Sequence, residues 1–448
     1  MKKILWILGS LLMGCQSKFL EEKPNKALLV PTTVADFRAL LNNMATGDLN
    51  IYPGLNTLAD DDFVAQPSSI QSLSEIEQKA YLWKSDVFGS EASNDWNKPY
   101  GAIFIANVVL DGIPYVPVTP DNQAEIEQLK GEAYFHRAFA LYGLLQQFAA
   151  PYQAETAPQE LGLPIRLTAN VNVLVGRGNL QQAYDQVLSD LDEAALRLAE
   201  RSVYRQRPSR WGVEGLRARV YLTMGRYDLA LVHATACLER GASLLDYQKL
   251  DTLAVRPMPR WEENPEIIFY SQTNPYLFHY EESTQLEAGL YASYQTGDLR
   301  RACFFTPDRV FKGSYSGSSG FSGSLTTGEV LLTRAECYAR LGQNQASLTD
   351  LNTLLQARFL AVHFQPYRLG AVSDVLDLVL RERRKELVAR GLRWADLRRL
   401  NLESRWQKTL ERVDDQGQRH ALKPNDPRYT FPIPTTEIQA SGIAQNPR

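Results

Sequence analysis

Apolar residues recur at intervals of three or four positions through much of the chain, a spacing typical of amphipathic α-helices. Seven such stretches are long enough to predict a helix. They cover residues 34–43, 124–148, 179–200, 213–224, 227–238, 330–341 and 345–357. Two further short helices are expected near the C-terminus. This pattern predicts a mainly all-α protein.

Four of these helices form two pairs with the same local pattern. In each pair the first helix ends in Tyr-x-x-x-Gly, at Tyr221/Gly225 and at Tyr338/Gly342, and a second helix follows at once. Ser209 is positioned to cap the first pair. A tight turn between two antiparallel helices is typical of tetratricopeptide repeats, but a clean period of about 34 residues is absent. We therefore expect a degenerate tetratricopeptide-like helical block at about 124–240 and 328–401.

Residues 241–327 are different, because they are rich in Tyr, Phe, Trp, Pro, Gly and Ser and show no sustained helical period. Within them, residues 313–324 alternate Gly and Ser with aromatic residues, which predicts a flexible polar loop. Long loops within a compact domain are usually functional or disordered. We expect this part to form a loop-rich, irregular ligand-binding face, and we expect another irregular region at 401–428.

Near the C-terminus, apolar residues at helical spacing are expected to form the buried side of a helix that ends at Gly391. They are Val372, Leu376, Leu380 and Leu387. A second short helix is indicated by Trp394, Leu397 and Leu400. Residues 381–399 contain eight Lys or Arg but only three Asp or Glu. We expect several of these arginines to be partly buried and paired with Glu386, Asp396 and acidic residues upstream.

The N-terminus has the pattern of a secretory signal. Lys2 and Lys3 precede a short apolar run that ends in Leu12-Met13-Gly14-Cys15. This sequence resembles a bacterial lipobox, so residues 1–14 are expected to be removed and Cys15 to carry lipid. Acyl chains add about 0.8 kcal/mol per buried CH₂, and several chains make detachment negligible. The alternative is a secreted soluble protein with an incidental cysteine.

Composition narrows the range of functions. With 44% hydrophobic residues, 22% charged residues and a net charge of −3, the chain has no general attraction to nucleic acid. No apolar run reaches the roughly 20 residues that span a bilayer. Four cysteines, without Cys-x-x-Cys spacing, indicate neither a zinc site nor a redox motif. Cys237 and Cys337 are expected to fill small spaces in the core.

A series of motifs in the same order along the chain resembles the SusD/RagB family of surface lipoproteins. The most specific is R-R-K-E-L-x-x-x-G-x-R-W-x-D-L-R-R at 383–399. The others include the Trp96 helix, the helix pair at 209–240, Gly-Asp-x-Arg-Arg at 297–301 and Pro-Ile-Pro at 432–434. We expect Trp96 to be a core residue. We expect the Gly-Asp-x-Arg-Arg motif to form a structural ion pair. The family pattern usually has Glu where this chain has Arg390, a departure expected to remove one ion pair.

The resemblance implies one SusD-like lipoprotein domain at 15–448, anchored at the outer membrane and exposed at the cell surface. It also implies a lid-like complex with a SusC-like TonB-dependent transporter and an oligosaccharide ligand, with peptides as the nearest alternative. A pure protein–protein adaptor and a surface enzyme that cleaves glycans or peptides remain alternatives from other classes.

No catalytic motif supports the enzyme alternative. The five histidines lack metal-binding spacing, and neither a Gly-x-Ser-x-Gly elbow nor a phosphate-binding loop is present. We therefore predict no catalytic residues, no metal and no cofactor. The acidic triplet at 60–62 is consistent with a calcium site, but turn and helix-cap chemistry is the preferred interpretation.

The binding hypothesis depends on aromatic side chains in loops that face solvent, because sugar rings and peptide side chains both stack on such surfaces. The candidate ligand-binding residues are Trp261, Tyr276, Phe278, Tyr280, Tyr315, Phe321 and Trp83.

Overall fold

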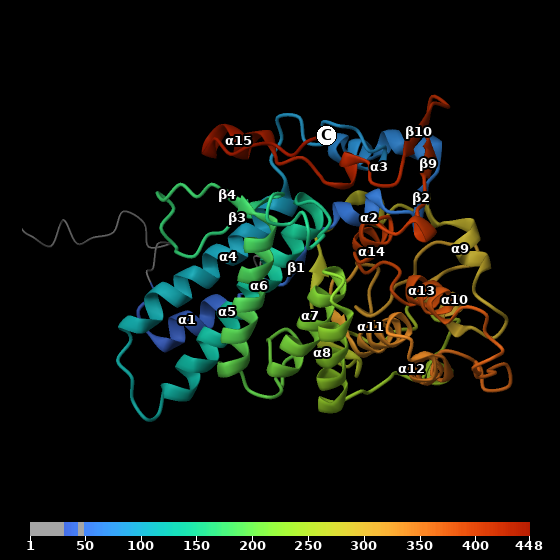
Figure 1. The fold of residues 1–448 in the computed structure, drawn as a ribbon, viewed down its shortest axis with the longest axis horizontal. Helices are drawn as coiled ribbons and strands as arrows, with labels where there is room; N and C mark the ends of the chain where they lie inside the picture. Colours follow the sequence, from blue (N-terminus) through green and yellow to red (C-terminus); the bar gives the residue numbers. More distant parts are fainter. Residues whose placement is uncertain (1–30, 44–48) are drawn as a thin grey trace, which may run out of the picture.

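The computed structural model describes residues 31–43 and 49–448. The signal segment and Cys15 lie outside this part of the chain. Helices dominate the described residues and follow one another in the order of the sequence (Figure 1). They are α1 (Val34–Asn42), α2 (Leu55–Ala59), α3 (Glu75–Tyr81), α4 (Asn94–Gly112), α5 (Gln123–Phe148), α6 (Leu180–Arg197), α7 (Arg210–Thr223), α8 (Tyr227–Arg240), α9 (Ala288–Ala292), α10 (Leu299–Phe304), α11 (Thr327–Arg340), α12 (Asn344–Gln356), α13 (Val375–Glu386), α14 (Arg393–Leu400) and α15 (Thr435–Ser441).

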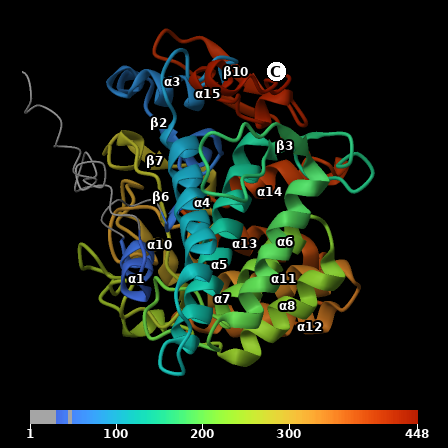
Figure 2. The same cartoon turned by 90° about the vertical axis from the view of Figure 1, so that its left-hand side faces the viewer.

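The longer helices pack as a row of neighbours. Helix α5 lies between α4 and α6, α7 packs on α6 and α8, and α11 packs on α8, α12 and α13 (Figures 1 and 2). The all-α prediction and the predicted helix positions are therefore confirmed. In the described residues no helix is both long and apolar enough to cross a membrane.

Both predicted helix pairs are present, and both use a left-handed glycine at the turn. Gly225 has φ 70° between α7 and α8, and Gly342 has φ 77° between α11 and α12. Ser209 caps α7 through its hydroxyl, which accepts a hydrogen bond from the backbone N–H of Gly212. Ala230 and Ala335 are fully buried, and α8 contacts α11. Small residues therefore allow the two pairs to pack into one helical block, as the tetratricopeptide-like pattern predicts.

Strands within the described residues occur only as short two-stranded pairs. The pair β1–β6 is parallel, whereas β2–β7, β3–β4, β5–β8 and β9–β10 are antiparallel. Their bounds are β1 (Ile51–Tyr52), β2 (Phe63–Ala65), β3 (Leu161–Pro164), β4 (Arg177–Asn179), β5 (Ile267–Phe269), β6 (Gln272–Thr273), β7 (Thr284–Leu286), β8 (Leu325–Thr326), β9 (Leu410–Val413) and β10 (Arg419–Leu422).

The C-terminal segment differs from its prediction in three places. Helix α13 ends at Glu386 and not at the predicted Gly391, although Gly391 has a left-handed φ of 66°. The buried side of α13 carries Val375, Val379 and Glu386, whereas Val372, Leu376 and Leu380 are only partly buried. Of the four predicted residues only Leu387 is buried. Glu382 and Glu386 lie on the buried side because they pair with the buried arginines Arg300 and Arg358. The third difference is the β9–β10 hairpin inside the region expected to be irregular. Its strands are too short and too charged for their alternation to stand out.

The Gly/Ser-rich segment at 313–324 is not a flexible surface loop. Gly313 to Ser316 and Phe321 to Ser324 are buried, and only the tip between them reaches solvent. The Ser322 and Ser324 hydroxyl oxygens lie 2.7 Å apart, and both lie 3.1 Å from the carbonyl oxygen of Ser271, so the two hydroxyls share this acceptor and each other. Small side chains are needed here because the segment threads through the interior and makes its polar contacts there.

Candidate functional site

A stacked aromatic pair on the irregular segment faces solvent on one side. The rings of Trp261 and Tyr270 lie 4.2 Å apart at an interplanar angle of 11°. Tyr270 is buried, but Trp261 is only partly buried, so the buried ring supports one face of the indole. This arrangement fixes the position of the Trp261 ring, so a group stacked on its open face would cost little side-chain entropy.

A second aromatic residue, Tyr280, follows a short 3₁₀ helix at Leu277–His279 and is 52% exposed. The tip of the 313–324 segment lies between it and the stacked pair. A Cβ on Gly317 would lie 2.6 Å from the Cα of Arg260, and a Cβ on Gly320 would lie 3.8 Å from the Tyr280 hydroxyl oxygen. The loop tip therefore connects Arg260, next to Trp261, with Tyr280.

Polar groups surround these rings. The exposed side chain of Gln272 donates a hydrogen bond of 2.8 Å to the Tyr270 hydroxyl. Arg260 and Glu262 form an exposed ion pair at 2.8 Å, and Ser318 is exposed at the loop tip. Burial raises the pKa of Tyr270, so its hydroxyl stays protonated and available for hydrogen bonding. We call Trp261, Tyr270, Gln272, Tyr280 and Ser318 the aromatic face.

The other predicted ligand residues do not present a ring to solvent. Phe278, Tyr315, Phe321 and Trp83 are at most 3% exposed, so the expectation that they face solvent is wrong for these four. Each occupies a packed site that sequence spacing does not reveal. Phe321, for example, stacks on His279 at 4.3 Å, and the Trp83 indole donates to the carbonyl of Ala59 at 2.8 Å.

Tyr276 is intermediate, because its ring is partly buried and its hydroxyl points to a buried carboxylate. The hydroxyl lies 3.1 Å from Asp95 Oδ1 and 3.1 Å from the amide of Asn274. Burial, followed by the charge of Asp95, raises the pKa of Tyr276 well above its usual value. These contacts give Tyr276 a structural role beside the aromatic face.

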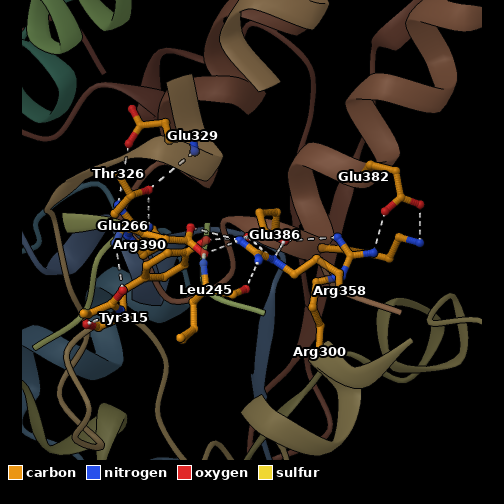
Figure 3. Close-up of polar contacts among 12 residues, drawn as sticks. Leu245, Glu266, Arg300, Tyr315, Thr326, Glu329, Arg358, Glu382, Glu386 and Arg390 are labelled. Carbon is orange, nitrogen blue, oxygen red and sulfur yellow. Dashed lines mark hydrogen bonds and ion pairs between the residues drawn. The ribbon is translucent and has the colours of Figure 1, made fainter. Parts of the chain in front are cut away.

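A network of buried charged side chains lies in the interior next to the irregular segment 241–327 (Figure 3). Arg358 binds Glu266 at 2.8 Å and Glu386 at 2.9 Å, and Arg300 binds Glu386 at 3.2 Å and Glu382 at 2.6 Å. Burial raises the pKa of Glu386, but the charges of Arg358 and Arg300 outweigh burial and lower the pKa to about 2. The Tyr315 hydroxyl also bonds to Glu386, so the network connects the 313–324 segment to α13.

Paired arginines were predicted for residues 381–399, and the prediction is confirmed for Asp396 and for acidic residues upstream. It is wrong for Glu386, whose partners Arg300 and Arg358 lie outside this stretch. Arg383 and Arg399 both bind Asp396, at 2.8 and 2.9 Å. The expected structural pair Asp298–Arg300 is present at 2.7 Å. The expectation for Arg390 is wrong, because its guanidinium lies 3.5 Å from Glu329 and 4.5 Å above the Tyr315 ring. The departure at this position therefore supplies an ion pair.

The acidic triplet is used within the protein. Asp62 Oδ1 accepts from Arg384 Nε at 2.8 Å, and Asp61 binds both Arg393 and Lys408 at 2.6 Å. Asp60 ends α2 and accepts a hydrogen bond from the backbone N–H of Asp62, as turn chemistry predicts. Across the described residues, no group of three or more His, Cys, Asp or Glu is arranged to hold a metal ion.

Sequence reasoning missed Tyr270 and Gln272, which complete the aromatic face. Tyr270 follows the apolar strand β5, where the run Ile-Ile-Phe-Tyr suggests only a buried strand. No periodicity distinguishes a residue that supports an exposed ring from one that fills the core. The expected core roles of Trp96, Cys237 and Cys337 are confirmed by their burial.

Two family models match the chain. The model described as starch-binding and associating with the outer membrane covers residues 18–222, and the SusD family model covers residues 322–448. A SusD-like protein of Formosa agariphila, P38, is 23% identical over 390 residues, which are 68% of this chain and 72% of that protein.

Solved structures share the fold over nearly the whole chain. A putative sugar binding protein from Bacteroides vulgatus has a TM-score of 0.75 at 21% identity, covering 93% of this chain and 99% of its own. A SusD superfamily protein from Bacteroides thetaiotaomicron has the same TM-score and identity and covers 93% and 100%. Surface glycan-binding protein A from Bacteroides fluxus has a TM-score of 0.69 at 16% identity, covering 93% and 100%.

Proposed function

Because the chain belongs to the SusD/RagB family, we propose that it captures oligosaccharides at the cell surface without altering them. In this proposal Cys15 carries the lipid anchor, and the bound glycan passes to a SusC-like TonB-dependent transporter. The family is one of carbohydrate-binding proteins associated with the outer membrane. Binding is the contribution of this chain, and the transporter supplies the energy.

The aromatic face carries this proposal. A sugar ring has an apolar face of C–H groups that packs on an indole and hydroxyls around its edge that need donors and acceptors. Trp261 offers the flat surface, and its position is set by Tyr270 at 4.2 Å. Gln272, which donates to the Tyr270 hydroxyl, and Ser318, at the loop tip, are both exposed and would offer polar partners to the hydroxyls of a stacked sugar.

Peptide capture is the first alternative, since aromatic side chains also bind peptides. A surface enzyme is the second, and it would form products from a glycan or a peptide. The third alternative, a protein–protein adaptor, would bind no small ligand. The groups near Trp261 favour sugars over peptides. They are the neutral amide of Gln272, the hydroxyl of Tyr270, and the Arg260–Glu262 pair, in which the two charges offset each other.

Glycan-array and calorimetric binding by the mature protein tests the proposal. We expect Trp261→Ala to weaken binding at least tenfold and Tyr280→Ala by a smaller factor, with no product formed. Tyr115→Ala, at an 87% exposed tyrosine outside the aromatic face, is the matched control and is expected to bind normally. Equal binding by wild type and Trp261→Ala would remove the aromatic face as the site. Binding of peptides but not glycans, or release of cleaved product, would contradict the proposed function.

A further inference from the structure

A cleft of about 760 Å³ is present in the described part of the chain. Its walls are the loop after α5, residues 150–161, the end of α14, and the C-terminal residues 425–447. Backbone and side-chain bonds hold these walls together: the Phe431 N–H donates to the carbonyl of Gln147, and Asn446 donates to the carbonyl of Phe148. The cleft is therefore a built feature of the fold and shares no residue with the aromatic face.

Arg398, which lines the cleft, is a buried cation without a carboxylate partner among the described residues. Its terminal nitrogens donate to the carbonyls of Gln146 and Ala149 at the end of α5, where the helix dipole offsets part of a positive charge. Its Nε has no hydrogen-bond partner. The adjacent Arg399, by contrast, is paired with Asp396 at 2.9 Å and with Glu336. Burial lowers the pKa of Arg398 to about 10, so the guanidinium remains charged at neutral pH.

Two more polar side chains of the lining lack full hydrogen bonding. Asn401 is 1% exposed and Tyr429 is 3% exposed. The Tyr429 hydroxyl interacts with the Asn401 side chain, and neither the Asn401 Nδ2 nor this hydroxyl has another partner within the described residues. Buried donors without acceptors are uncommon in native proteins and suggest a missing partner.

The mouth of the cleft has a different chemistry. Gln153, Gln159 and Asn425 are exposed there, and amides both donate to and accept from hydroxyls. Of the acidic residues in the lining, Asp426 is paired with Arg428 at 2.7 Å, and Glu160 is exposed. The deep part thus holds a positive charge and hydrogen-bond donors, whereas the mouth combines neutral amides with the exposed carboxylate of Glu160.

We propose that this cleft is a second ligand site and that it binds a carboxylated sugar residue, with the carboxylate toward Arg398, Asn401 and Tyr429 and the hydroxyls at the amide-lined mouth. A carboxylate supplies the acceptors and the negative charge that the deep part lacks. The choice of a sugar depends on the proposed function, whereas the need for an anionic group depends only on the cleft.

Asn401→Asp is the sharpest test, because it keeps the side-chain oxygen that accepts from the Lys408 N–H and changes only the amide nitrogen to an oxygen. The carboxylate introduced by this substitution would occupy the position proposed for the carboxylate of the ligand. Tyr429→Phe removes only a hydroxyl and keeps the ring stacked on Trp394 at 4.8 Å. Arg398 itself is not a suitable target, because it holds the end of α5.

The probe is a trimer of galacturonic acid, measured by calorimetry beside its neutral counterpart, a trimer of galactose. We expect the wild type to bind the acidic trimer at least tenfold more tightly. Asn401→Asp is expected to remove most of this binding, Tyr429→Phe to weaken it several-fold, and Tyr115→Ala, outside the cleft and the aromatic face, to leave it unchanged. Thermal unfolding confirms that each variant is folded.

The inference is overturned if the acidic trimer does not bind, if both trimers bind equally, or if Asn401→Asp binds like the wild type. Binding of sodium acetate as tightly as the acidic trimer would overturn the assignment of a sugar. The cleft proposal and the proposed function can fail independently. Neutral glycans on the array and the Trp261→Ala variant test the aromatic face, whereas the acidic trimer and the Asn401→Asp variant test the cleft.

Discussion

At the scale of single residues, buried arginines and carboxylates organise the interior as much as apolar side chains do. Arg300, Arg358 and Glu386 are fully buried, and each carboxylate oxygen of Glu386 contacts a guanidinium. Burial of such charges is unfavourable unless each has a partner, so the loss of one partner leaves another charge unpaired. Glu386 holds both arginines and also Tyr315, which makes it the most sensitive point of the network.

We predict that Glu386→Gln lowers the free energy of unfolding by about 3 kcal/mol, because Arg300 and Arg358 lose a shared counter-charge. Urea denaturation at pH 7 measures the change. Glu263→Gln, at an exposed glutamate, is the matched control and is expected to change stability by less than about 0.5 kcal/mol. A loss as small as that of the control would show that the network adds little to stability.

The same network predicts the response of stability to acid. The pKa of Glu386 is lowered to about 2 in the folded protein, against about 4.3 in an unfolded chain. A lowered folded-state pKa gives stability that is present above the unfolded value and lost as pH falls toward the folded one. We therefore expect wild-type stability to fall between about pH 4.5 and 2, with a shallower fall in Glu386→Gln. Parallel pH curves for the two proteins would contradict this.

At the scale of elements, the helix pairs depend on backbone conformation at one residue each. Gly225 and Gly342 are left-handed, and a Cβ at either would meet nothing within 4 Å. The requirement for glycine is therefore conformational and does not come from crowding. The Tyr-x-x-x-Gly turn can therefore be predicted from the sequence, because it depends on the preference of glycine for a left-handed φ and not on contacts with the partner helix.

We predict that Gly342→Ala destabilises the protein by about 1 kcal/mol, because a side chain in the left-handed region strains the backbone. Gly176→Ala is the matched control, since Gly176 is also free of neighbours but has no left-handed φ. It is expected to be neutral or slightly stabilising, because alanine restricts the unfolded chain. Denaturant midpoints compare the two, and equal midpoints would contradict the conformational argument.

At the scale of the whole molecule, segments far apart in sequence complete each other. Asp61, near the start of the described chain, binds Arg393 and Lys408 near its end, and Asn446 holds the end of α5. The irregular segment lies over the same interior and carries the aromatic face outward. The helical block therefore presents the aromatic face, whose residues come from several loops.

The position of this molecule in the cell is predicted to depend on Cys15, which lies outside the described residues. Several acyl chains make release from a membrane negligible, so Cys15→Ser is expected to move the protein from the membrane fraction to the soluble fraction. Immunoblotting of fractionated cells measures the shift. Ser17→Ala, two residues away, is the control. Unchanged membrane association of Cys15→Ser would remove the lipid anchor from the proposal.

The helix positions, the glycine turns, the family and the paired arginines of the C-terminal motif were readable from the sequence. Each depends on local periodicity, on the conformation of one residue or on a contiguous motif. Tertiary structure alone decided which face of α13 is buried, that the 313–324 segment runs through the interior, and that Trp261 stands on Tyr270. Burial depends on neighbours that are distant in sequence, and an aromatic residue in a loop has the same local signature whether it supports the core or waits for a ligand.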